Sequence, residues 1–362
     1  MKKIKLYIFH PYSRIGGADL SLSRLINNLD DKKYSITFIT LEKPKIKFYL
    51  KKKIEIHIIK RKRAIYSIFE LRNIVKKDFN QYSKIIFISN QHFANIISVI
   101  ALRGIKSAKL ILIERNNPIE LDYSNKLKDK IIKILIKITY RFSDKIIAIS
   151  KELAKDLEKL CNKKVTTIYN PAFDKNIFKL AAKKIIKKNF KIILNVARFE
   201  KQKNHIMLLE SFKDIHNTVN AKLFLIGYGS EKKEIIEYIK KNNLKKRVTL
   251  ISNNKNVYSY YKIADLFVLS SIYEGFGNVL VEAGMFKIPI ISTNCKSGPR
   301  EILKNGQYGD LVNIGDKKKM SKLIVKNLKK PDKSKISKMY QSLKIFNIKN
   351  HILQYEKIFK KI

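Results

Sequence analysis

Two glutamates mark the stretch of this sequence with the clearest chemical potential. Glu274 and Glu282 have seven residues between them, and two of those seven are glycines. An apolar run at 265–271 precedes them and is typical of a buried strand, whereas 278–287 is typical of a helix that Asn278 can cap. A strand, a glycine turn and a helix N-terminus present free backbone N–H groups to an anion. The pattern therefore predicts a ligand site at this turn, with an ordinary strand-to-helix connection as the alternative.

Two cations follow a different apolar run. Arg198 and Lys203 come directly after 191–196, which also reads as a strand. In a parallel sheet, the segments that follow the strands meet at one edge. We therefore expect this pair to lie near the glycine turn. Because Lys and Arg are abundant in this chain, an accidental surface pair is the alternative.

The stretch from Glu274 to Glu282 resembles the signature of retaining glycosyltransferase family 4. The likeness continues through 282–293 and 297–303, in the spacing of Arg198 and Lys203, and in the Gly-Gly pair near the start. The resemblance implies an α/β protein of the GT-B fold. In that fold two Rossmann-like doubly wound domains face each other across a cleft, and a C-terminal helix crosses back.

Regular alternation of strand and helix patterns agrees with parallel sheets of this kind. By resemblance we expect an acceptor-binding domain at 1–172 and a nucleotide-sugar-binding domain at 173–340. Residues 341–362 are expected to form the helix that packs back on the first domain. Residues 173–190, which are rich in lysine, are a candidate linker between the two domains.

The resemblance also implies roles for individual residues. The catalytic set is Glu274, Arg198 and Lys203, in which Glu274 binds the hydroxyls of the donor sugar and the cations stabilise charge on the diphosphate leaving group. Glu282 is expected on the ribose hydroxyls. The expected donor-binding set is Gly16, Gly17, Gly227, Phe276, Gly277, Asn278, Glu282, Arg300 and Glu301.

One position departs from the family pattern. Many members carry a histidine after the strand that corresponds to 110–113, where this chain has Glu114, Arg115 and Asn116. Arg115 and Asn116 are therefore candidates for the acceptor side. No Asp-x-Asp pair occurs in the chain, so we expect no metal and no resident cofactor, with a nucleotide sugar as co-substrate.

The expected reaction transfers a hexose or N-acetylhexosamine from a UDP-sugar to a saccharide acceptor. The acceptor is expected to be carried on lipid, as in the assembly of bacterial surface polysaccharides, lipopolysaccharide and glycans. Two alternatives remain open at this point, a basic nucleic-acid-binding protein and a GT-B sugar-nucleotide epimerase. The first follows from the net charge of +47, but the basic excess is spread along the chain and no nucleic-acid motif is present, so no nucleic-acid partner is expected.

The charge also suggests an anionic membrane as a partner. Lysines and arginines with interleaved aromatic residues crowd 45–63, and 126–138 reads as a helix with lysines on one face and Ile131, Leu135 and Ile138 on another. A core-facing helix is the alternative for the second segment. The chain has two cysteines and no apolar run long enough to span a bilayer. We therefore expect a cytoplasmic protein, peripheral on the inner face of the cell membrane.

Overall fold

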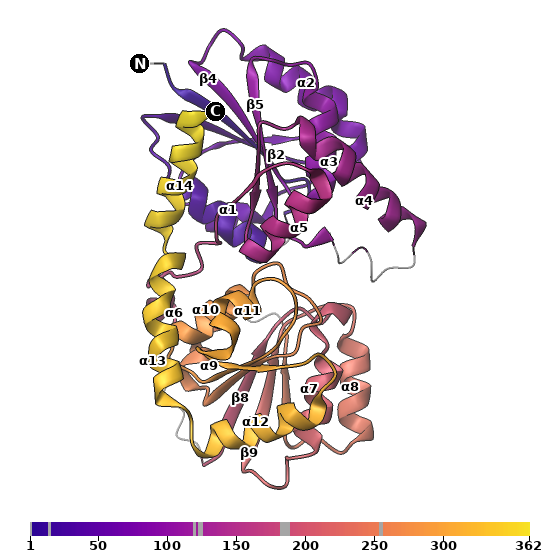
Figure 1. The fold of residues 1–362 in the computed structure, drawn as a ribbon, viewed down its shortest axis with the longest axis vertical. Helices are drawn as coiled ribbons and strands as arrows, with labels where there is room; N and C mark the ends of the chain where they lie inside the picture. The colour runs from indigo at the N-terminus through magenta and orange to yellow at the C-terminus, as the bar shows by residue number, and fades with distance from the viewer. Residues whose placement is uncertain (1, 14–15, 119–120, 122–125, 182–188, 253–255) are drawn as a thin grey trace. The chain divides into compact units, whose positions relative to one another are not determined.

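The structure, a computed structural model, describes residues 2–13, 16–118, 121, 126–181, 189–252 and 256–362. The chain divides into two compact units (Figure 1). Unit 1 comprises Met1–Pro171 and Ile348–Ile362, and unit 2 comprises Ala172–Asn347. Each unit is built on one parallel sheet, which confirms the prediction of two doubly wound domains.

Unit 1 contains a seven-stranded sheet in the order β3-β2-β1-β4-β5-β6-β7, and every pair is parallel. The inner strands are mostly apolar and almost fully buried because helices cover both faces of the sheet. The strands are β1 (Ile4–Phe9), β2 (Tyr34–Thr40), β3 (Glu55–Ile58), β4 (Lys84–Asn90), β5 (Ala108–Glu114), β6 (Lys145–Ala148) and β7 (Val165–Thr167). The helices are α1 (Gly17–Asn28), α2 (Ile68–Lys77), α3 (His92–Leu102), α4 (Leu127–Thr139), α5 (Lys151–Cys161) and α14 (Ile348–Lys361), with short 3-10 turns η1 (Lys45–Tyr49), η2 (Ala64–Ser67) and η4 (Tyr140–Phe142).

Helix α14, the last of the chain, belongs to unit 1 and runs beside α1 (Figure 1). It buries His351, Tyr355 and Phe359. The Phe359 ring meets the ring of Tyr34 at 5.7 Å between centroids, and the Lys84 ammonium donates to the Phe359 carbonyl at 3.1 Å. Strand β2 and strand β4 are therefore both joined to a helix that lies more than 250 positions later in the chain.

Unit 2 contains a six-stranded parallel sheet in the order β10-β9-β8-β11-β12-β13. Its strands are β8 (Lys191–Val196), β9 (Ala221–Ile226), β10 (Val248–Ile251), β11 (Leu266–Leu269), β12 (Ile290–Thr293) and β13 (Asp310–Val312). Its helices are α6 (Asn176–Leu180), α7 (His205–Lys213), α8 (Lys232–Lys241), α9 (Tyr258–Ile263), α10 (Asn278–Met285), α11 (Pro299–Ile302), α12 (Lys317–Lys329) and α13 (Lys333–Ser342), with 3-10 turns η5 (Lys201–Lys203), η6 (Lys304–Gly306) and η7 (Leu343–Phe346).

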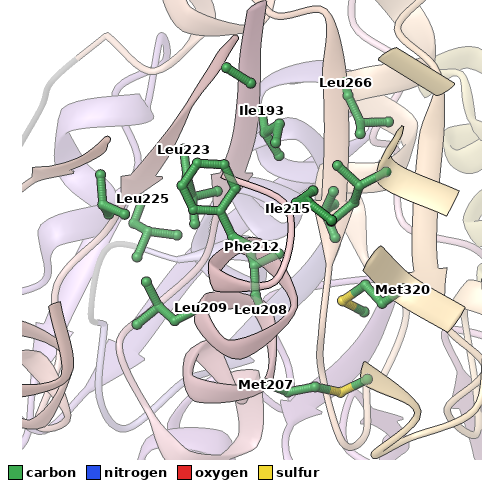
Figure 2. Close-up of a cluster of buried hydrophobic side chains, with 14 of the residues drawn as sticks. Ile193, Met207, Leu208, Leu209, Phe212, Ile215, Leu223, Leu225, Leu266 and Met320 are labelled. Carbon is green, nitrogen blue, oxygen red and sulfur yellow. The ribbon is translucent and has the colours of Figure 1, made fainter. Parts of the chain in front are cut away.

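The core of unit 2 lies between this sheet and helices α7 and α12. Phe212 and Leu208 on α7 point at Leu223 and Ile193 of the sheet, and Met320 of α12 closes the cluster (Figure 2). These five side chains are at most 1% exposed. Close packing of this kind holds the ends of β8 and β11 in fixed positions, and the candidate site begins at those ends.

Two expectations about local structure need correction. The candidate linker at 173–190 includes helix α6, where the Phe178 ring meets the Phe286 ring at 5.1 Å, so this part of it packs within unit 2. In α4 the buried residues are Ile132, Ile136 and Thr139. Ile131 and Ile138, which the alternative of a core-facing helix would bury, are about half exposed at 47% and 48%. Helix spacing offers two apolar stripes here, and packing selects the other one.

Candidate functional site

The candidate site of unit 2 lies where the strand order reverses. β8 pairs on one side with β9, which follows it in sequence, and on the other with β11. In open parallel sheets, ligands bind beyond the carboxyl ends of strands at such a reversal. The segments that follow β8 and β11 carry Arg198, Lys203 and Glu274. The sheet thus brings together the residues that the sequence analysis grouped as catalytic.

Three hydrogen bonds to backbone carbonyls join the two segments. The Ile272 N–H donates to the Gln202 carbonyl at 2.8 Å, and the Gln202 side-chain amide donates to the Tyr273 carbonyl at 2.8 Å. The Ser270 hydroxyl donates to the Lys203 carbonyl at 2.8 Å. Reciprocal bonds of this kind fix one segment relative to the other before any ligand arrives.

Lys203 and Glu274 form an ion pair, with 2.5 Å between Nζ and Oε1. The Ser271 hydroxyl donates to the same carboxylate oxygen at 2.7 Å. Glu274 is 6% exposed, so its charge is stabilised by this ammonium and hydroxyl rather than by bulk water. Arg198, in contrast, is exposed and forms no ion pair with any residue that the structure describes. A fixed carboxylate, a lysine and an open arginine can together bind a ligand that carries both hydroxyls and negative charge.

Helix α10 begins at Asn278, as the sequence predicts, but Asn278 does not cap it. Asn278 is the first helical residue, and the N-cap is Gly277, which has φ +95° and no side-chain capping bond. The expectation that Asn278 caps the helix was wrong because a left-handed backbone, which glycine adopts at little cost, makes the turn. Gly298 presses against this turn from behind, since a Cβ on it would lie 1.8 Å from the Phe276 carbonyl oxygen. The first turn of α10 therefore lacks a side-chain cap, which leaves its N–H groups suited to an anion.

Glu282 lies in α10 and is also nearly buried. It accepts a hydrogen bond of 3.1 Å from the hydroxyl of Tyr261 on α9. The Tyr261 ring stacks against Phe286 at 5.7 Å and Phe267 at 5.6 Å. Burial, together with the neighbouring Glu282 charge, raises the pKa of Tyr261 well above its usual value, so this hydroxyl remains a donor. Tyr261 could not be identified from the sequence, because a tyrosine within an aromatic run gives no sign of its partner.

The remaining donor-side residues also lie in unit 2. Gly227 allows β9 and β8 to approach each other, since a Cβ there would lie 1.8 Å from the Ala197 carbonyl oxygen. The Arg300 guanidinium donates from Nε to the Asn294 side chain at 2.9 Å. Arg300 and Glu301 both lie in α11 and are partly exposed. Gly227 therefore shapes the segment that carries Arg198, and Arg300 holds the segment after β12.

Four candidates belong to unit 1. Gly16 is the N-cap of α1, Gly17 is its first residue, and no side chain caps this helix. Arg115 is 6% exposed and donates to the side chains of Asn90 at 2.5 Å and Asn170 at 2.7 Å. Asn116 is partly exposed, and its N–H donates to Glu114 at 3.2 Å. Arg115 is thus enclosed by side-chain amides, whereas Asn116 remains accessible. The sequence analysis also missed His10, Asp19, Asn90 and Asn170, which lie in the same buried cluster as Arg115.

Among the residues that the structure describes, no three His, Cys, Asp or Glu side chains are grouped to hold a metal ion. In the same part of the chain, no helix is long and apolar enough to cross a membrane.

Comparison with known proteins gives a consistent result. A family model described as glycosyl transferases group 1 matches residues 176–343, and one described as glycosyltransferase family 4 matches 15–172. An uncharacterized glycosyltransferase of Methanocaldococcus jannaschii is 33% identical over 75% of this chain and 72% of its own length.

A second relative is named for its activity. It is the N-acetylgalactosamine-N,N'-diacetylbacillosaminyl-diphospho-undecaprenol 4-alpha-N-acetylgalactosaminyltransferase of Campylobacter jejuni, 31% identical over 62% of each chain. Among solved structures, HepE of Anabaena in complex with UDP-glucose superposes with a TM-score of 0.81 at 17% identity, over 99% of this chain and 100% of its own. This likeness confirms the predicted GT-B fold.

Proposed function

We propose that this chain, which belongs to glycosyltransferase family 4 and is therefore a glycosyltransferase of a retaining family, moves a hexose or N-acetylhexosamine from a UDP-sugar to a lipid-linked saccharide. The product is a bacterial surface polysaccharide or glycan. Family membership decides against the two earlier alternatives, a nucleic-acid-binding protein and an epimerase. The observation that carries the proposal is the Lys203–Glu274–Ser271 cluster beside the first turn of α10.

In the proposed reaction, negative charge grows on the diphosphate as the bond to the sugar breaks. Arg198, Lys203 and the N–H groups at the start of α10 stabilise that charge, in the way a preorganised site stabilises an oxyanion. Glu274 accepts hydrogen bonds from the sugar hydroxyls, and Glu282 accepts them from the ribose. Glu274 is 6% exposed and held by two donors on one oxygen, so it keeps its orientation while the ligand changes. These cations take the place that a divalent metal occupies in other transferases.

The acceptor class is supported by the relatives. The Campylobacter jejuni enzyme is named for a diphospho-undecaprenol acceptor and an N-acetylgalactosaminyl donor group. Another relative is named as a capsular polysaccharide biosynthesis glycosyltransferase of Staphylococcus aureus, at 28% identity over 74% of its length. An acceptor carried on lipid requires the enzyme to work at a membrane surface.

Unit 1 offers a surface that suits this requirement. Leu127, Ile131, Ile134 and Ile138 form a stripe at helical spacing along the outer side of α4, and Leu127 is 73% exposed. Lysines 126, 128, 130, 133 and 137 flank the stripe. A helix with this pattern lies in the plane of an interface, with its apolar side among the lipids. We propose that α4 docks on anionic membrane.

Neighbouring elements extend this surface. α3 packs against both α2 and α4, so the three helices form one layer. Phe69 at the start of α2 is 77% exposed on this layer. A second candidate surface is formed by the basic residues of 45–63 with Phe48, which is 83% exposed in η1, and η1 packs on α1. Anionic lipid attracts each juxtamembrane cation by about 1 kcal/mol. A few lysines from this layer are therefore enough for reversible docking at the cytoplasmic face.

The transfer proposal is tested by hydrolysis of a panel of UDP-sugars and GDP-sugars by the purified protein. We expect slow release of UDP from one UDP-hexose or UDP-N-acetylhexosamine, with the anomeric configuration of the sugar retained. Hydrolysis of GDP-sugars alone, or inversion of the anomeric centre, contradicts the proposal.

The docking proposal is tested by co-sedimentation with phosphatidylglycerol vesicles and with neutral vesicles, at low and high salt. We expect binding to the anionic vesicles that weakens with salt. It should weaken further when Lys51, Lys52, Lys53, Arg61, Lys62 and Arg63 become Gln, and when Ile131 and Ile134 become Ser. Equal binding to both lipids refutes the docking.

A further inference from the structure

A buried polar cluster in unit 1 has no role in the proposed reaction. His10 directly follows β1, Asn90 ends β4, Arg115 follows β5, and Asp19 lies in the first turn of α1. Each of these residues is at most 6% exposed. Four polar side chains from four segments thus meet at the carboxyl edge of this sheet, where they are shielded from hydrogen bonding to bulk water.

The chemistry of arginine fixes the orientation of its neighbours. A guanidinium only donates hydrogen bonds, and it stays charged in proteins. Arg115 donates from Nε to Oδ1 of Asn90 and from a terminal nitrogen to Oδ1 of Asn170. Both asparagines must therefore turn their oxygen toward Arg115, which leaves the NH₂ group of Asn90 facing the other way.

The Asn90 amide in turn determines where His10 carries its proton. The Asn90 NH₂ group lies 2.9 Å from Nδ1 of His10 and can only donate. Nδ1 is therefore the bare acceptor, and the proton of the neutral ring is on Nε2. That nitrogen lies 3.6 Å from Oδ1 of Asp19, which also accepts 2.6 Å from the Ser13 hydroxyl. Asn90 and His10 therefore have one compatible arrangement of protons as long as Arg115 is present.

Asp19 connects this series of buried side chains to the glycine pair. It lies two residues after Gly17, in a helix whose N-cap, Gly16, contributes no side-chain bond. A carboxylate in the first turn is stabilised by the helix dipole, and here the Ser13 hydroxyl donates to it while Nε2 of His10 lies beside the same oxygen. The backbone that begins α1 is thus fixed through a side chain inside the helix instead of a cap.

We propose that Arg115 is a positioning residue, which through Asn90 holds His10 as the Nε2–H tautomer against Asp19 and so fixes the Gly16–Gly17 turn. The inference rests on the proposed function and on the expectation that Gly16 and Gly17 belong to the donor-binding set. It gives a reason for an arginine at the position where many family members have a histidine. Arg115 acts through the turn and does not touch the acceptor.

Other charged groups surround the cluster. Glu114 of β5 accepts from the Arg115 N–H at 2.9 Å and from the hydroxyl of Tyr140 at 2.6 Å, so its charge balances the guanidinium from the backbone side. The side chains of α14 that face Arg115 are Tyr355 and His351, and Arg24 of α1 faces His351. Among these groups and the members of the cluster, only Asp19 lies within ion-pair distance of His10. The proton positions on the His10 ring therefore report specifically on its contacts with Asn90 and Asp19.

The test compares Arg115→Met with Arg115→Lys by imidazole ¹⁵N NMR of the full chain. The His10 signal is assigned by its loss in His10→Gln. We expect the Nε2–H tautomer in the wild type, the same tautomer in Arg115→Lys, and a mixture in Arg115→Met, where the Asn90 amide is free to flip. An unchanged spectrum in Arg115→Met, or a doubly protonated His10 in the wild type at pH 7, overturns the proposal.

A second pair of variants keeps the test decisive if Arg115→Met does not fold. In Asn90→Asp both carboxylate oxygens accept, so His10 should become doubly protonated at neutral pH. The matched control is Asn170→Asp, which adds the same charge beside the same guanidinium without touching His10 and should leave the ring neutral. The proposal is refuted if His10 stays neutral in Asn90→Asp.

Turnover separates this inference from the function on which it rests. The donor kcat/KM should fall roughly ten- to hundredfold in Arg115→Met, because small displacements of a binding group have effects of this size, and Arg115→Lys should recover part of the loss. A changed tautomer with unchanged turnover overturns the positioning role. A wild-type protein that hydrolyses no nucleotide sugar refutes the function and the link to the donor, while the spectra still decide the proton arrangement.

Discussion

The two sheets end in polar clusters that are built in opposite ways. In unit 2 the charged groups pair directly, Lys203 with Glu274, and Arg198 remains exposed. In unit 1 the Arg115 cation bonds to two neutral amides, and its nearest cluster neighbours are 0% to 5% exposed. The same position at the end of a parallel strand can therefore hold charge ready for a ligand, or use charge to orient neighbouring groups. The difference predicts that substitutions in unit 2 affect turnover first, and substitutions in unit 1 affect stability first.

The largest expected effect is on turnover in unit 2. Glu274→Ala should abolish transfer, and Arg198→Ala or Lys203→Ala should lower kcat by roughly two to three orders of magnitude, the size of one lost preorganised contact. Lys201→Ala is the matched control, since Lys201 is an exposed cation in the same turn. Initial rates with the preferred nucleotide sugar give the measurement. Near-wild-type rates in all three site variants would remove the site assignment.

The next effect is on stability, and it separates the two clusters. Asn90→Leu leaves the Arg115 Nε–H and the His10 ring without their partner, so unit 1 should lose roughly 2–3 kcal/mol. Ser271→Ala removes one donor from Glu274 while Lys203 remains, so unit 2 should lose about 1 kcal/mol. Hydrogen exchange resolved by unit measures both losses. An equal loss in the two variants contradicts the proposed difference between the clusters.

A pH effect distinguishes one histidine in each unit. Burial lowers the pKa of His351 in unit 1 to about 3, and burial with the Lys203 charge lowers the pKa of His205 in unit 2 to about 4. Below pH 6.5 the unfolded chain binds protons that the folded chain does not. Stability is therefore complete above pH 6.5 and falls as pH decreases, by up to about 1.4 kcal/mol per pH unit for each histidine.

The pH effect is measured as unfolding free energy between pH 7 and pH 4, again resolved by unit. His351→Gln should flatten the dependence in unit 1 alone, and His205→Phe should flatten it in unit 2 alone. His57, which is exposed on an edge strand, provides the control. The assignment fails if substitution of His57 flattens the curve as much as the other two changes.

The smallest expected effect is that of a chelator. In the proposed reaction Arg198, Lys203 and helix N–H groups stabilise the leaving diphosphate, so EDTA should leave turnover unchanged. Rates with and without EDTA, then with added Mg²⁺ or Mn²⁺, give the measurement. Loss of activity that either ion restores would show that unit 2 relies on a metal as well as on its cations.

In unit 2, the grouping of Lys203 with Glu274 could be predicted because the sequence information is local. Glu274, Glu282 and the glycines lie on one short stretch, and Lys203 reaches them through the pairing of neighbouring strands, which a parallel sheet makes predictable. The N-cap of α10 was misplaced by one residue because the backbone angle of Gly277 is a property of the turn. Sequence spacing carries no sign of that angle.

The unit 1 cluster could not be found in the same way. His10, Asn90 and Arg115 are separated by 80 and 25 positions, and each looks like a lone polar residue at the end of a strand. Their partnership arises only when β1, β4 and β5 pair. Helix α4 is a second case in which the sequence is not sufficient, since two apolar stripes fit its helical spacing. Only the packed structure shows that the stripe with Ile132 and Ile136 is buried.

The membership of α14 in unit 1 makes unit 2 an insertion within unit 1. During synthesis on a ribosome, unit 2 can complete its core as soon as residue 347 has emerged. Unit 1 must wait for Tyr355 and Phe359, although all seven of its strands are synthesised first. A chain truncated before Ile348 should therefore lose the first half of its sequence to proteolysis and keep the second half, the reverse of what the position of the cut suggests.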